Sequence, residues 1–112
     1  MNRTLFAIIT AGLLMAGIGV KAAGDIIAND PMLMGADTAP VEIRPNPDPQ
    51  LALPVHEMAL AINDVHLLES LALEDLAAKN VNEFALIMEP LKLEGATGST
   101  LARVAVHEQG KP

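Results

Sequence analysis

"VHEMALAINDVHLLESLALEDLAAKN", residues 55–80, gives the strongest structural signal in the sequence. It follows Pro54 and contains no glycine or proline, which is typical of a helix that begins directly after a proline. At about 100° per residue, its apolar side chains lie on two sides of a helix, one of them formed by Leu60, Leu67 and Leu71. The pattern predicts one long amphipathic helix over about residues 55–80 that contacts two neighbours. We therefore predict these three leucines as interaction residues.

The segment after this helix changes its periodicity. Two short runs rich in branched apolar residues, VNEFALIMEPLKL and STLARVAVHE, flank the glycine-containing stretch EGATG. Such a pattern predicts a β-hairpin over about residues 84–107. The alternative is a second helix over residues 81–88 that ends before Pro90, which would make the protein mostly α. The predicted fold class is a small α+β protein.

The segment before the helix is rich in proline. Six of the eight prolines lie between residues 31 and 54, and the run RPNPDPQ has proline at every second position. Each proline fixes its own φ and disfavours the helical region for the residue before it. Residues 23–54 are therefore expected to form a flexible, acidic, proline-rich spacer, extended and polyproline-like from Pro40 to Pro54.

The N-terminal segment has the features of an export signal. Arg3 precedes an apolar run over residues 5–20, and small side chains surround Ala22. The first expectation is a signal peptide, residues 1–22, that is removed after Ala22. The alternative is a retained membrane anchor through residues 5–23, although the run is shorter than the ~20 residues of a typical span. Both alternatives place the remaining chain outside the cytoplasm, either periplasmic or secreted, or anchored to the inner membrane.

Composition excludes several classes of function. The chain of 112 residues has a formal charge of −7 and no cysteine, and its aromatic residues are two phenylalanines. An acidic chain repels nucleic acid and anionic lipid headgroups, so we expect no nucleic-acid partner. Without cysteine, neither a disulfide framework nor a thiolate metal site can form.

No pattern typical of catalysis is found. His56 begins the sequence HEMAL, but Leu60 takes the place of the second histidine in the H-E-x-x-H zinc motif. His66 lies ten residues further along the predicted helix, about 15 Å from His56, and the third histidine is His107. We expect no enzyme, no cofactor and no metal site. The weaker candidate is a soft-metal site for Cu(I) formed by Met32, Met34 and His56.

The predicted folded part is small. It covers residues 55–108, followed by a tail of residues 109–112. A chain of this size buries too little surface to be stable alone, and no disulfide can compensate. We therefore predict an exported envelope protein, an accessory subunit or adaptor, that acts by association with a protein partner or with itself. The alternatives are a copper carrier and a single-pass anchored subunit of a membrane complex. The sequence identifies neither the partner nor the oligomeric state.

Overall fold

The protein contains both helices and strands, as predicted for the α+β class. The computed structural model describes residues 5–8 and 17–108. It divides into two units, residues 1–73 and residues 74–112, hereafter unit 1 and unit 2. The elements, in chain order, are β1 (Leu5–Ile8), α1 (Val20–Ile27), β2 (Leu33–Ala36), α2 (Pro54–His56), the π-helix η1 (Glu57–Ile62), β3 (His66–Leu68), α3 (Glu74–Ala78), β4 (Ala85–Pro90) and β5 (Leu101–Val106).

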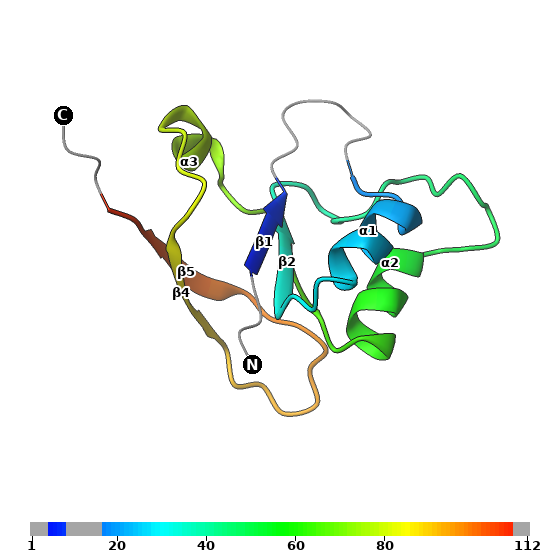
Figure 1. Ribbon diagram of the computed structural model, residues 1–112. Coiled ribbons are helices and arrows are strands. Elements are labelled where there is room, and N and C mark those ends of the chain that lie inside the picture. The colour runs from blue at the N-terminus through cyan, green and yellow to red at the C-terminus, as the bar shows by residue number, and fades with distance from the viewer. Residues whose placement is uncertain (1–4, 9–16, 109–112) are drawn as a thin grey trace. The chain divides into compact units, whose positions relative to one another are not determined.

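Unit 1 is built on a parallel sheet with the order β1-β2-β3. In the register, Leu33 of β2 lies beside Leu5 of β1 and beside His66 of β3. Parallel neighbours need long crossover connections, which usually contain a helix. Here α1 lies in the connection from β1 to β2, and α2 with η1 lies in the connection from β2 to β3. Both helical segments lie on the same side of β2 (Figure 1).

The main core lies between these helical segments and β2. Met34 and Ala36 of β2 are fully buried. They cluster with six further buried residues of unit 1, namely Ile18, Ala23, Val41, Val55, Ala59 and Val65. Because α1 and α2 contribute one residue each, the core fixes both helices against the sheet.

The other face of β2 is buried as well. Leu33 is buried, and so are Leu68, Leu71 and Leu73. A Cβ atom on Gly35 would lie 2.8 Å from Cδ1 of Leu71, so the glycine allows this leucine to approach the strand. All four residues of β2 are buried, which is typical of the central strand of a parallel sheet.

The prediction of one helix over residues 55–80 is wrong. Pro54 does begin a helix, but the helix ends at Ile62 after its π-helical turns. Asn63 Nδ2 donates to the Met58 carbonyl at this end, and Asp64 has a φ of 53°. The chain then forms β3, whose pairing with β2 satisfies backbone groups that a continued helix would have bonded internally. Helical structure returns only in the short α3.

The predicted spacer, residues 23–54, begins within α1 and includes β2. From residue 37 to residue 53 the structure has no named helix or strand, and the Ala39–Pro40 and Arg44–Pro45 peptide bonds are cis. The predicted leader falls largely on residues 1–4 and 9–16, which lie outside the described residues. Among the residues that the structure does describe, no helix has both the length and the apolar character needed to cross a membrane.

Unit 2 contains the predicted hairpin. Strands β4 and β5 pair antiparallel, and the register joins Ala85 to Val106 and Pro90 to Leu101. Residues 85–88 are thus strand, as predicted, and not the alternative helix. In the connecting loop, the Leu91 N–H donates to Ser99 Oγ over 3.2 Å, and Gly95 has a φ of 72° that glycine adopts without strain.

Candidate functional site

Glu42 is brought into unit 1 by a short parallel bridge. The Ile18 N–H donates to the Val41 carbonyl over 3.0 Å, and the Ile43 N–H donates to the Ile18 carbonyl over 3.1 Å. The two segments lie so close that a Cβ atom on Gly17 would overlap the carbonyl carbon of Glu42. This contact fixes the backbone of Glu42. The residue as a whole is only 1 % exposed.

The buried carboxylate of Glu42 lies at the start of the α2–η1 helix. Its Oε2 accepts from the Val55 N–H over 3.2 Å, and its Oε1 accepts from the His56 N–H over 3.2 Å. The first N–H groups of a helix have no partner within the helix, and a negative charge is favourable at this end. Glu42 thus caps a helix that begins twelve residues further along the chain.

The same carboxylate also orients the ring of His56. Glu42 Oε1 lies 2.5 Å from His56 Nδ1. On the other side of the ring, Nε2 lies 3.3 Å from Oε1 of Glu69, and that oxygen also accepts from the Val41 N–H over 2.8 Å. The side chains of His56 and Glu69 are 23 % and 33 % exposed. The His56 cluster, defined as Glu42, His56 and Glu69, therefore extends from the interior to the surface.

This geometry suits two chemical states of the ring. If both nitrogens are protonated, the imidazolium donates toward both carboxylates. If only Nδ1 is protonated, it donates to Glu42, and the lone pair of Nε2 faces the Glu69 oxygen. The 3.3 Å between Nε2 and Oε1 is long for a hydrogen bond. It is close to the separation of about 3.4 Å expected for two ligands that each lie about 2.05 Å from one tetrahedral ion.

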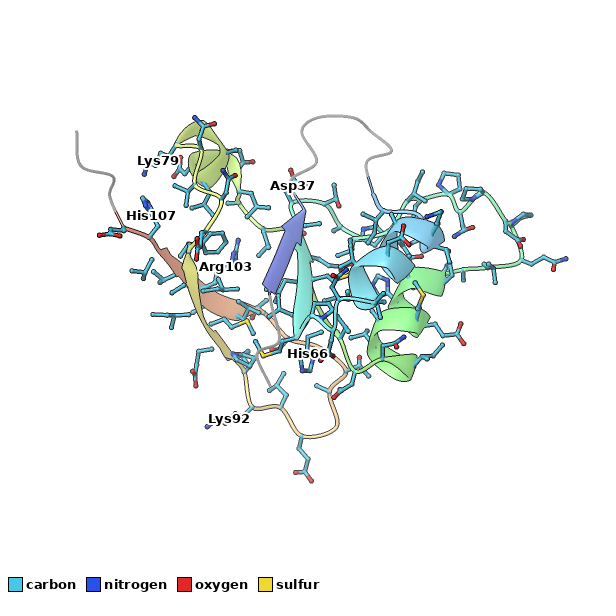
Figure 2. All side chains as sticks on the ribbon, viewed as in Figure 1. Asp37, His66, Lys79, Lys92, Arg103 and His107 are labelled. Carbon is cyan, nitrogen blue, oxygen red and sulfur yellow. The ribbon has the colours of Figure 1, made fainter. Side chains whose placement is uncertain are left out.

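Met32 and Met34, the other predicted metal ligands, lie in different environments. Met34 is fully buried in the main core of unit 1, whereas Met32, two residues earlier, is exposed. His66 lies exposed on β3 and is labelled in Figure 2. Within the described ranges, 5–8 and 17–108, no group of three or more histidine, cysteine, aspartate or glutamate residues is arranged to hold a metal ion.

The predicted interaction residues occupy three different environments. Leu60 is exposed on η1, Leu67 of β3 is partly buried against the main core, and Leu71 is buried beside Gly35. They do not form one ridge, because the chain between Leu60 and Leu71 changes from helix to strand. Leu60 is the member of the set whose side chain is available at the surface.

Sequence reasoning did not find the His56 cluster. Its members are separated by 14 and 13 positions and lie on different segments. One local signal was present: Glu42 stands between Val41 and Ile43, and a lone acid between branched apolar residues is typical of a buried, partnered carboxylate. Comparisons with protein-family models, with curated proteins and with solved structures gave no match.

Proposed function

We propose that the chain binds a divalent metal ion through His56 and Glu69. The observation that carries this proposal is the position of the His56 ring, with Nδ1 on the buried carboxylate of Glu42 and Nε2 facing Glu69. A histidine that binds a metal through one nitrogen commonly donates its other N–H to a carboxylate, which fixes the ring and its tautomer.

The ligand types favour Zn²⁺ or a similar ion of the first transition row. An imidazole nitrogen and a carboxylate oxygen are common ligands of Zn²⁺, at about 2.0–2.2 Å. Two protein ligands would leave the further positions of a tetrahedral ion to water. A metal ion held by His56 and Glu69 would lower the pKa of a water bound to it, and the chemistry that it would supply there is metal-assisted hydrolysis.

Titration calorimetry of the full chain with Zn²⁺ tests this proposal. We expect His56→Ala to weaken binding by at least about 100-fold and Glu69→Gln by about 10- to 100-fold. His66→Ala and His107→Ala are the matched controls, because these histidines lie outside the cluster, and both should bind as the natural chain does. Acid should weaken binding, since protons compete for Nε2.

Two results would overturn the metal proposal. The first is equal Zn²⁺ affinity of the natural chain and His56→Ala. The second is no Zn²⁺ binding by the natural chain while His56→Ala lowers its thermal stability, which would make the cluster an imidazolium paired with two carboxylates. Circular dichroism of each variant separates loss of a ligand from loss of the fold.

A second candidate function is that of an exported accessory or adaptor protein that acts by association without chemistry. It is favoured by unit 2, in which Ile87, Leu91 and Val104 are all more than half exposed. The exposed residues of unit 2 do not bear on three other proposals: a cleaved signal peptide, a membrane-anchored subunit, and a Cu(I) carrier that uses Met32 and Met34. The mature N-terminus, read by mass spectrometry from the native host, distinguishes the first two.

A further inference from the structure

The hairpin of unit 2 has two unlike faces. Residues paired across an antiparallel ladder point to the same face, and successive residues alternate. The register places one set of side chains on the face that we call the exposed face, namely Ala85, Ile87, Glu89, Ala102, Val104 and Val106. Every residue of this set is exposed, whereas Leu86, Met88, Leu101 and Ala105 on the opposite face are partly buried.

The exposed face is apolar and contains one charge. Ile87 and Val104 form its central pair and are 61 % and 58 % exposed. The pair at one end is Ala85 with Val106, and the pair at the other end is Glu89 with Ala102. Arg103, labelled in Figure 2, belongs to the opposite face. An isolated two-stranded hairpin is marginally stable, so a contiguous apolar face of this kind gains most by packing on a second sheet.

We propose that the exposed face packs against the same face of a second copy of the chain, with a two-fold axis that reverses the strand direction. This arrangement places β4 over β4 of the second copy. The central Ile87 and Val104 then meet their own counterparts, and at each end one large side chain meets an alanine: Glu89 lies over the second Ala85, and Val106 lies over the second Ala102. In this arrangement the order of large and small residues along the face matches that of the second copy.

Charge selects this orientation over its alternative. With the strand direction reversed, the two Glu89 side chains lie at opposite ends of the interface, about 14 Å apart at about 3.4 Å per residue. That distance exceeds the Debye length of about 8–10 Å at ordinary salt. With the strand direction kept, Glu89 would lie over the second Ala102, and two like charges would meet on adjacent strands. Glu89, the one charged residue among the six that define this face, thus determines how the copies stack.

This inference deepens the second candidate function, the one of association, and does not depend on the metal site. Sedimentation velocity of the full chain over a range of concentrations should show a monomer–dimer equilibrium. Ile87→Glu and Val104→Glu should each raise the dimer Kd on the order of 100-fold, because a charge would be buried in the interface. Ile62→Glu is the matched control: Ile62 is 70 % exposed but lies in unit 1, and this change should leave the Kd as it is.

A pair of lysine variants tests the orientation without removing any apolar contact. Ala85→Lys places a cation over Glu89 of the second copy and should lower the Kd roughly two- to fivefold. Ala102→Lys should not lower it. Three results would contradict the proposal. The first is a chain that stays monomeric at all concentrations, and the second is a dimer that Ile62→Glu disrupts while Val104→Glu does not. The third is a dimer that Ala102→Lys strengthens and Ala85→Lys does not. None of these results depends on Zn²⁺ binding, so failure here and failure of the metal site are distinguishable.

Discussion

Units 1 and 2 both contain paired strands but bury their side chains very differently. In unit 1, both faces of β2 are buried, and side chains from α1, α2, η1 and β3 close over it. In unit 2, no residue of the described range 74–108 is buried. The comparison shows that an antiparallel hairpin can satisfy its backbone locally, whereas a parallel sheet exists only together with the crossover segments packed on it.

The two units also treat charge differently. Unit 1 contains a carboxylate that is almost completely buried and has hydrogen bonds from two backbone N–H groups and one imidazole. The acidic residues of unit 2 are exposed. A buried, fully bonded carboxylate is costly to disturb, while an exposed one contributes little to stability. Three pairs of substitutions, each with one member in each unit, test the contrast between the units.

The largest effect is expected at Glu42. Glu42→Ala leaves the Val55 and His56 N–H groups and the His56 ring without their acceptor inside the protein, and should lower the free energy of unfolding by about 3–5 kcal/mol. Glu94→Ala in the exposed loop of unit 2 is its counterpart and should change stability by less than about 0.5 kcal/mol. Denaturant unfolding followed by circular dichroism measures both. Similar losses in the two variants would remove the distinction.

A glycine pair gives the next largest effect. In Gly17→Ala the new Cβ would overlap the Glu42 carbonyl carbon and the Ile43 nitrogen, both backbone atoms that cannot move independently. We expect a loss of about 2–4 kcal/mol, because the bridge between the segments must open. Gly98→Ala in unit 2 meets no atom within 4 Å and should be neutral or slightly stabilising. The shift in Tm of each variant is the test, and a Gly17→Ala variant as stable as the natural chain contradicts the packing described.

The smallest of the three effects concerns apolar truncation. Val55 is buried in the main core, so Val55→Ala should cost about 2 kcal/mol through lost contacts and a residual cavity. Leu93 is exposed in the loop of unit 2, and Leu93→Ala removes more atoms but should cost less than about 0.5 kcal/mol. Urea unfolding measures the loss of stability in both variants. A larger loss for Leu93→Ala than for Val55→Ala would mean that Leu93 is covered in solution.

The hairpin was predictable because its determinants are local. The hairpin needs two runs of branched residues and a loop that contains Gly95 and Gly98, and all of these lie within some 25 positions. The length of the loop then sets the register of the two strands. The choice between strand and helix for residues 81–88 was decided by pairing with β5, which the sequence favoured but left open. Local pattern and final structure agree here because nothing remote has to be brought together.

The long helix was mispredicted because residues 64–73 are determined by a remote partner. Taken alone, HLLESLAL satisfies a helical period. In the fold, the N–H of His66 donates to the Met32 carbonyl and the N–H of Leu71 donates to the Ala36 carbonyl, so both bond to the region of β2 more than thirty positions earlier. The predicted side formed by Leu60, Leu67 and Leu71 does not exist in the fold, because these residues lie on η1, on β3 and in the segment after β3. The His56 cluster was missed for the same reason, since its geometry exists only after β2 and β3 have paired.

The parallel register also determines in which order the chain can fold. Leu5 and Leu33 are paired across 28 positions and Leu33 and His66 across 33, whereas the hairpin pairs Pro90 with Leu101 across 11. Closing longer loops costs more entropy before any contact compensates it, and folding slows as contact order rises. Hairpins form in about 1–10 μs, so unit 2 can form its ladder while the apolar segments of unit 1 are still open. During that interval the strand sequences of unit 1 are exposed to other chains, which makes aggregation the expected competitor of refolding at high concentration.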